Sequence, residues 1–179
     1  MALAAWCLTR GGLRPVVDVE ELLRSESPGW IDLEIGDLPL LEPFRDLLLG
    51  HPLSWEDASK PGQRPKLEDH GDHLFLIVRS LDTRKEWLAL QLQTLQMACF
   101  LGTRHLITVR SGALKAVDEV RERLERGLAP PSEGPDGILH AVLDSIVDAY
   151  APHMDRWEEE VERLDKEALR DPKAQVLGR

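Results

Sequence analysis

Short glycine-containing turns separate runs of strand length between residues 65 and 110, and three of these runs are largely apolar. Residues 65–70 and 73–81 flank one such turn, and residues 97–101 and 105–110 flank the next. Two runs of strand length joined by a short turn that contains glycine are typical of a β-hairpin. In residues 73–81 both alternating sets of side chains are largely apolar, which indicates a strand covered on both faces. This region is therefore predicted to form two hairpins of a sheet that lies between two other layers.

The flanking segments predict further strands and several helices. Strand-like runs occupy residues 3–9, 14–17, 30–35 and 87–93. Helical patterns occupy residues 19–23, 37–49 and 114–126; Asp18 caps the first, and Gly50 and Gly127 stop the others. We therefore expect an α+β fold with αβα layers, in which helices flank a mixed β-sheet.

The last part of the chain is helical in pattern and strongly acidic. Ten acidic and four basic side chains lie between Asp144 and Asp171. Apolar residues recur at steps of four and three, as in a heptad seam: Tyr150, Met154, Trp157, Val161, Leu164 and Ala168. Pro152 removes a helical hydrogen bond, so a kink or break is expected near residues 148–152. The expected division is an α/β core over residues 1–129, a loop or hinge over 130–135 and a long acidic helix over 136–179.

Composition argues against several classes of function. The chain has 179 residues, with 22 basic and 32 acidic side chains and a net charge of −10, which argues against a nucleic-acid surface. Cys7 and Cys99 lie in apolar runs and are expected to be reduced thiols rather than zinc ligands or a disulfide. The sequence has no glycine-rich phosphate loop and no Gly-x-Ser-x-Gly motif, so we do not expect an enzyme. No stretch approaches the roughly 20 apolar residues of a membrane helix.

The acidic turn at residues 51–57 reads His-Pro-Leu-Ser-Trp-Glu-Asp. One interpretation is structural: Ser54 caps a short helix, and Glu56 and Asp57 favour the dipole of its first turn. The other interpretation is a hard-cation site, because Mg²⁺ and Ca²⁺ prefer carboxylate oxygens. The spacing alone favours the first interpretation and leaves the second open.

The same turn belongs to an ordered set of motifs. It is followed by Arg-Pro-Lys-Leu-Glu at residues 64–68 and then by an apolar strand. Three more segments fit the set: Trp-Ile-Asp-Leu at 30–33, Phe-Leu-Gly-Thr-Arg-His-Leu-Ile-Thr-Val-Arg at 100–110, and Ile-Leu-His-Ala-Val-Leu-Asp-Ser-Ile-Val-Asp-Ala-Tyr at 138–150. In this order, and over nearly the whole chain, the set resembles the cytoplasmic domain of the CorA family of divalent-cation channels.

The resemblance implies a metal-sensing role for three carboxylates. Asp57 matches the family's regulatory-site aspartate, which faces an aspartate on the stalk helix of the neighbouring subunit. The resemblance places that partner beyond Arg179, so a weak half-site is expected in this chain alone. Glu56 and Asp144 match the acidic residues of a second, adjacent regulatory site. The implied function is the gating of ion transport by metal bound between subunits. The implied ion is Mg²⁺, with Co²⁺, Ni²⁺ or Zn²⁺ as alternatives.

The resemblance also implies an assembly and a location. Family members are homopentamers, and this domain lies on the cytoplasmic side of the cell's inner membrane. Neither the family's membrane helices nor its Gly-Met-Asn signature occurs before Arg179, so we expect a soluble fragment of a longer membrane protein. The expected partners are other copies of the chain, divalent cations and the membrane, but not nucleic acid.

Two alternatives to a magnesium transporter stay open. One is a Zn²⁺ transporter of the related ZntB branch, although Arg-Pro-Lys at residues 64–66 leans toward the magnesium branch. The other is a stand-alone soluble module that uses the heptad seam to dock a partner helix. The polar run at residues 68–73, with two histidines among carboxylates, is interpreted as a turn between strands rather than as a Zn²⁺ site.

Overall fold

The computed structural model describes residues 3–82, 93–128 and 134–170, and its strands form one mixed sheet. Over these residues the sheet has seven strands in the order β2-β1-β3-β7-β6-β5-β4. β3 and β7 pair in parallel, and the other neighbouring strands are antiparallel. In chain order the strands are β1 (Ala4–Thr9), β2 (Gly12–Pro15), β3 (Gly29–Glu34), β4 (Lys66–Asp69), β5 (His73–Leu81), β6 (Thr94–Gly102) and β7 (His105–Arg110). The predicted mixed sheet and both predicted hairpins are confirmed.

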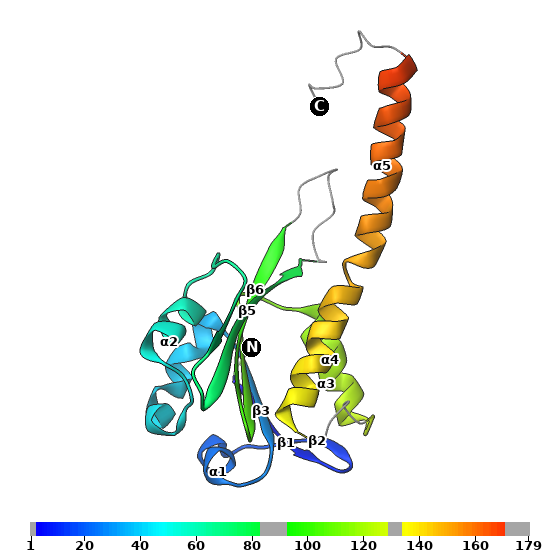
Figure 1. Cartoon of the computed structure of the whole chain (residues 1–179). Coiled ribbons are helices and arrows are strands. Elements are labelled where there is room, and N and C mark those ends of the chain that lie inside the picture. The colour runs from blue at the N-terminus through cyan, green and yellow to red at the C-terminus, as the bar shows by residue number, and fades with distance from the viewer. Residues whose placement is uncertain (1–2, 83–92, 129–133, 171–179) are drawn as a thin grey trace. The chain divides into compact units, whose positions relative to one another are not determined.

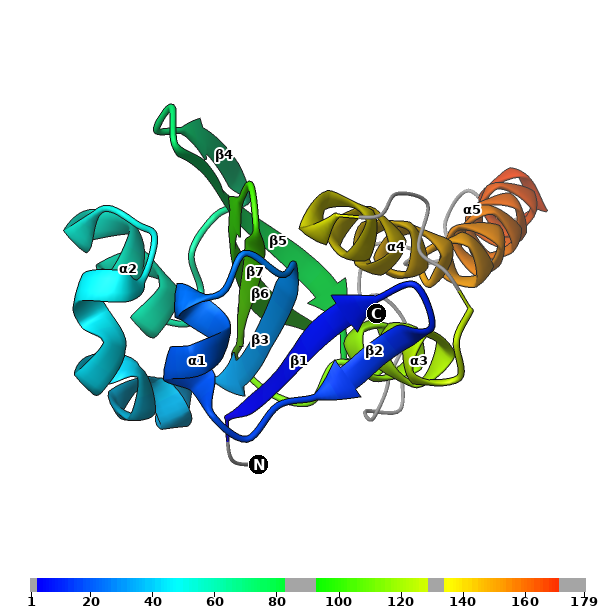
Figure 2. The ribbon, with the colours of Figure 1, turned by 90° about the horizontal axis from the view of Figure 1, so that it is seen from below.

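Helices cover both faces of this sheet (Figures 1 and 2). One face carries α1 (Val19–Arg24), the 3₁₀ helix η1 (Ile35–Leu47) and α2 (Pro52–Ser59). The opposite face carries α3 (Lys115–Glu125) and α4 (Pro135–Asp148). The predicted αβα layers are therefore confirmed, and the sheet separates α2 from α4.

The alternation of side chains along the strands fills two cores. The first core joins the sheet to α1, η1 and α2, and its buried members include Leu22, Leu23, Ile31, Leu33, Leu41, Ala58, Phe75, Ile77, Phe100, Ile107 and Val109. The alternate strand positions are buried on the opposite face, where the apolar stripe of α3 also lies: Trp30, Met97, Cys99 and Leu106 with Val117, Val120 and Leu124. Cys99 is buried and Cys7 is partly buried, and burial raises the pKa of the Cys99 thiol.

A buried polar cluster crosses the parallel strand pair. The Asp32 Oδ1 atom accepts a hydrogen bond of 2.6 Å from Thr108 Oγ1, and Asp32 Oδ2 lies 2.8 Å from Arg110 Nη2. Trp30 Nε1 donates a 3.0 Å hydrogen bond to the same Thr108 oxygen. Burial raises the pKa of Asp32 to about 6, although Arg110 and Thr108 act in the opposite direction. Because these side chains come from β3 and β7 alone, their contacts hold the two strands in one register.

The helix predicted over residues 37–49 is present at Ile35–Leu47, and it is the 3₁₀ helix η1 rather than an α-helix. Pro39 and Pro43 lie inside it, and each removes a backbone donor and clashes with the preceding α-helical turn. A 3₁₀ helix uses shorter i to i+3 hydrogen bonds and typically occurs in short pieces. The predicted apolar face still meets the core, since Leu41 is buried and Phe44 packs beside it.

The helical region after residue 134 is divided as the sequence predicts. α4 ends at Asp148 and α5 begins at Ala151 and continues to Arg170, so the predicted break near Pro152 is confirmed. Pro152 then lies in the first turn of α5, where a backbone N–H has no helical partner to lose. Contacts divide the chain between Ile146 and Val147, and most of α4 therefore belongs to the unit that contains the sheet.

Helix α5 is amphipathic and belongs to a second unit that begins at Val147. Its polar face carries ion pairs at helical spacing, such as Lys166 with Glu162 at 3.0 Å. Its apolar residues Met154 and Val161 are more than half exposed, at 56% and 57%. None of the helices in the described part of the chain combines the length and hydrophobicity of a membrane span.

Two predictions fall largely outside the described residues. The strand expected at residues 87–93 and the hinge expected at 130–135 are not described, apart from residue 93 and residues 134–135. The domain boundaries drawn from the hinge therefore stay a prediction.

The Asp32 carboxyl gives stability a specific dependence on pH. Its pKa rises from 3.8 to about 6 because burial disfavours the charged form. Between these values the folded state holds a proton that the unfolded state releases, so this group's contribution to the free energy of unfolding falls as pH rises. Urea unfolding from about pH 4 to about pH 7 should show wild-type stability falling relative to Asp32→Asn, by at most about 1.4 kcal/mol per pH unit. A difference that stays constant across this range would contradict the assignment.

Candidate metal site on helix α2

Helix α2 begins one turn earlier than the sequence suggests. His51 is its N-cap, and His51 Nδ1 accepts a 3.2 Å hydrogen bond from the Leu53 N–H. Pro52 follows at the first helical position, where its fixed φ favours helix initiation. The predicted Ser54 cap is therefore wrong, since Ser54 is buried inside the helix. No acidic residue lies in the first turn of α2, so a favourable interaction with the helix dipole does not account for the positions of Glu56 and Asp57.

Aromatic stacking fixes α2 against the sheet. The Trp55 ring stacks on Phe100 of β6 with centroids 4.1 Å apart, and Trp55 Nε1 donates a 3.1 Å hydrogen bond to the Leu49 carbonyl. Gly50 makes this approach possible at a φ of +122°, because a Cβ there would lie 2.6 Å from Trp55 Nε1. The entry of the chain into α2 thus requires glycine.

A buried glutamine holds the other end of α2. Gln96 of β6 is 1% exposed, and its Nε2 donates to the carbonyls of Asp57 at 3.3 Å and Lys60 at 3.1 Å. Its Oε1 accepts a 2.8 Å hydrogen bond from the Gln63 N–H. Gln96 therefore donates to two carbonyls at the C-terminal end of α2, and that of Asp57 also accepts a 3.3 Å hydrogen bond from the Lys60 N–H. A lone glutamine belongs to no sequence motif, so this role cannot be predicted from the sequence.

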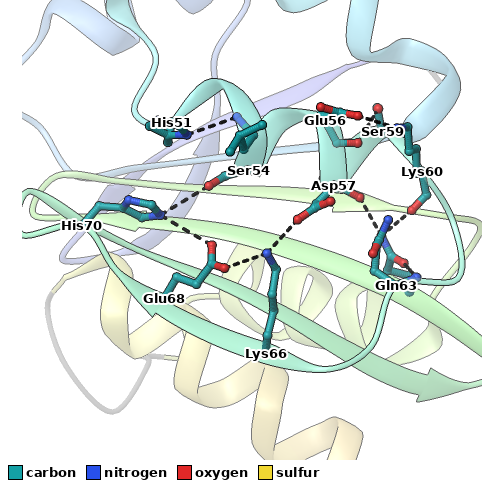
Figure 3. Close-up of polar contacts among 12 residues, drawn as sticks. His51, Ser54, Glu56, Asp57, Ser59, Lys60, Gln63, Lys66, Glu68 and His70 are labelled. Atoms are coloured by element: carbon teal, nitrogen blue, oxygen red, sulfur yellow. Dashed lines mark hydrogen bonds and ion pairs between the residues drawn. The ribbon is translucent and has the colours of Figure 1, made fainter.

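The two acidic side chains of α2 face different basic partners (Figure 3). Asp57 Oδ2 accepts a 2.7 Å hydrogen bond from Lys66 Nζ, which also donates to Glu68 Oε1 at 2.8 Å. Glu56 pairs with Lys60 one turn later on the surface. Burial lowers the pKa of Lys66, but its hydrogen bonds to Asp57 and Glu68 outweigh this and leave the pKa raised.

Histidines extend this cluster toward the turn between β4 and β5. His70 Nε2 lies 3.3 Å from Ser54 Oγ and 3.7 Å from Glu68 Oε2. The His70 ring stacks between His51 and His73, with centroid distances of 5.9 and 4.7 Å. These contacts account for the polar run at 68–73 as a packed turn. Within the described ranges, no three His, Cys, Asp or Glu side chains converge as metal ligands.

The three carboxylates predicted to bind metal do not meet within one chain. Glu56 and Asp57 are neighbours on α2, whereas Asp144 lies on α4 across the sheet (Figures 1 and 2). A site that combines Asp144 with either of the others therefore needs a second copy of the chain.

The carboxylate oxygens of α2 are the type of ligand that a hard cation prefers, but a single chain supplies too few of them at this position. Asp57 is about 30% exposed, and its Oδ1 has no hydrogen-bond donor among the described residues. A carboxylate oxygen of this kind suits Mg²⁺, which keeps most of its waters and needs one or two carboxylates. One chain supplies a half-site at Asp57, and a second carboxylate must come from elsewhere.

Sequence and structure comparisons identify the family. A family model described as CorA-like Mg²⁺ transporter protein matches residues 25–179. The chain belongs to this family. The match agrees with the prediction that it is not an enzyme, since the family consists of transporters.

Individual relatives agree with this assignment. The cobalt/magnesium transport protein CorA of Thermotoga maritima is 26% identical over 168 residues, which are 90% of this chain and 47% of that protein. The cytoplasmic domain of ZntB from Vibrio parahaemolyticus matches with a TM-score of 0.70 at 15% identity, covering 90% of this chain and 64% of that one. The soluble domain of CorA from Methanocaldococcus jannaschii matches with a TM-score of 0.65 at 16% identity, covering 97% and 67%. The chain thus has the fold of these domains and spans about half the length of the curated relative.

Removal of the Gln96 donors should destabilise the chain and loosen α2. Gln96→Glu keeps the side chain's size but turns an oxygen toward the carbonyls of Asp57 and Lys60, so we expect a loss of about 1–3 kcal/mol in the free energy of unfolding. Urea unfolding followed by Trp fluorescence measures it. Gln63→Glu makes the same chemical change where the side chain has no such contact, and it should cost less than about 0.5 kcal/mol. Equal losses in the two variants would rule out this role of Gln96.

Proposed function

We propose that this chain is the cytoplasmic, metal-sensing domain of a CorA-type divalent-cation transporter, with Mg²⁺ as the sensed and transported ion. The observation that carries the proposal is the Asp57 carboxylate on α2, one oxygen of which has no hydrogen-bond donor among the described residues. The chain that holds it belongs to the CorA-like family. The Thermotoga maritima relative is named a cobalt/magnesium transport protein, which supports Mg²⁺ and keeps Co²⁺ as the next choice.

The gating proposal rests on repulsion between carboxylates. In an assembly, Asp57 faces an acidic residue of the neighbouring copy, and two like charges at an interface repel each other. A bound divalent cation supplies the positive charge that offsets this repulsion. When Asp57 lacks that counter-charge, arrangements in which the copies move apart are favoured. Metal concentration then sets the equilibrium between the two arrangements through its differential affinity for them.

Glu56 and Asp144 belong to a second site in this proposal. They lie on opposite faces of one sheet, so only two neighbouring copies can bring them together. This requirement supports an assembly in which the α2 face of one copy meets the α4 face of the next. A ring, the homopentamer that the family resemblance implies, repeats this contact around its axis. In the proposed parent the ring lies on the cytoplasmic side of the membrane.

A zinc transporter is the first alternative, because the chain has the fold of a ZntB cytoplasmic domain as well as that of CorA. The ion can be tested on the complete gene product in vesicles. A ligand set of carboxylates and water is typical of Mg²⁺ sites, whereas Zn²⁺ sites usually include nitrogen or sulfur ligands, so we expect Mg²⁺ uptake to exceed Zn²⁺ uptake at equal concentration. Faster Zn²⁺ uptake would assign the chain to the zinc branch.

A helix-docking module is the second alternative, favoured by the exposed apolar residues of α5. Met154 and Val161 are open to solvent in the described structure. If docking were the function, α5 would recruit a helix of another protein, and metal would have no effect on it. Dependence of assembly on Mg²⁺ therefore separates this alternative from the metal-sensing domain.

Asp57 should control the response of the complete gene product to Mg²⁺. Asp57→Ala removes one carboxylate of the proposed bridge, so the Mg²⁺ concentration that protects the protein from limited proteolysis should rise about tenfold. Asp46→Ala removes an exposed carboxylate of η1 and should leave that concentration unchanged. Equal protection of the wild type and the Asp57 variant would refute the proposed role.

A further inference from the structure

Lys66 already occupies the position of a cation at the α2 site. Its Nζ lies 2.7 Å from Asp57 Oδ2 on α2 and 2.8 Å from Glu68 Oε1 on β4 (Figure 3). The same ammonium lies 5.1 Å from the centroid of the Phe75 ring, within range of a cation–π interaction. Two carboxylates from different elements and one aromatic face thus converge on a single positive charge.

A divalent cation and this ammonium compete for the same carboxylate. A cation on Asp57 Oδ1 would lie close to Lys66 Nζ, which is bound to the other oxygen of the same group. The repulsion between a double and a single positive charge at that range opposes binding. Binding then requires the ammonium to withdraw, and its flexible four-carbon stem, about 30% exposed, permits this movement.

The carboxylate on β4 has one more polar neighbour besides the ammonium. Glu68 Oε2 lies 3.7 Å from His70 Nε2, too far for a hydrogen bond, and the same nitrogen lies 3.3 Å from Ser54 Oγ of α2. The backbone of β4 keeps Glu68 next to Asp57 in the fold, and its side chain is 41% exposed. Withdrawal of Lys66 therefore exposes two carboxylates, Asp57 and Glu68, to an incoming cation.

We infer that Lys66 is an internal competitor of the sensed cation, which binds at Asp57 only by displacing the Lys66 ammonium from Asp57 and Glu68. The inference rests on the proposed function, because it concerns the affinity of the same site. Lys66 thereby raises the metal concentration at which the site fills. The competitor is selective by charge, since a monovalent ion gains less from the two carboxylates than a divalent one.

The test is Mg²⁺ titration of the chain by calorimetry, with MgCl₂ as the probe. Lys66→Met keeps the apolar stem over Phe75 but removes the charge, so Mg²⁺ should bind about tenfold more tightly than to the wild type. Lys66→Arg keeps the charge and should bind within about threefold of the wild type. The double variant Asp57→Asn with Lys66→Met should lose the gain. Lys66→Gln replaces the Met variant if far-UV circular dichroism shows that the latter is unfolded.

The outcomes separate this inference from the proposed function. If Lys66→Met binds Mg²⁺ no more tightly than the wild type, including no measurable binding by either, Lys66 is not a competitor. A gain that persists without Asp57 also overturns the inference. If Asp57→Ala alters the Mg²⁺ response of the complete gene product while Lys66→Met gains nothing, the proposed function stands and the inference fails. If the gain depends on Asp57 but the complete gene product ignores Asp57→Ala, the inference about the site stands and the sensing function fails.

Discussion

The parallel pairing of β3 with β7 is the contact on which the rest of the structure depends. It joins the β1–β2 hairpin and β3 to the antiparallel run of strands from β4 to β7. A slip of one residue would turn every side chain of β3 to the wrong face. It would also separate Asp32 from Thr108 and Arg110 and leave a buried charge without its partner, which is costly. The polar cluster therefore makes this register of β3 against β7 far more favourable than a register shifted by one residue.

The position of the sheet decides where the carboxylates lie. α2 is attached to β6 at both ends, through the Trp55–Phe100 stack and through Gln96. α4 packs on the other side of the same sheet, so its carboxylate at Asp144 cannot approach Asp57 in the same chain. A domain built in this way presents acidic groups on two opposite surfaces. This arrangement fits the proposed sensing of cations between copies rather than inside one copy.

The α2 site differs from an ordinary acidic patch because its charge is internally balanced. Lys66 offsets part of the negative charge of Asp57 and Glu68, and Lys60 does the same for Glu56. These ion pairs hold the carboxylates in place within a single chain. The fold places Glu56 and Asp57 on a rigid helix rather than on a loop.

Local chemistry was readable in the sequence, and contacts between distant residues were not. The glycine-containing hairpins, the Asp18 cap of α1 and the break before Pro152 depend on residues within a few positions of one another. The motif order also led to the correct family without any structure. The α2 cap was misassigned to Ser54, because the spacing of polar residues does not show that Pro52 starts the helix. Two prolines in η1 were likewise outweighed by an apolar pattern that suited an α-helix.

The sequence by itself determined the hairpins, the layers and the family, because periodicity, turn chemistry and motif order act along the chain. Only the tertiary structure decided that Gln96 donates a hydrogen bond to the Asp57 carbonyl, although the two residues are 39 positions apart in the sequence. It also decided that Lys66 pairs with the Asp57 carboxylate nine positions before it. It also decided that Asp144 lies across the sheet from both carboxylates of α2. The physical reason is that hydrogen bonds and ion pairs depend on distances of about 3 Å in space, which the linear order of residues does not specify.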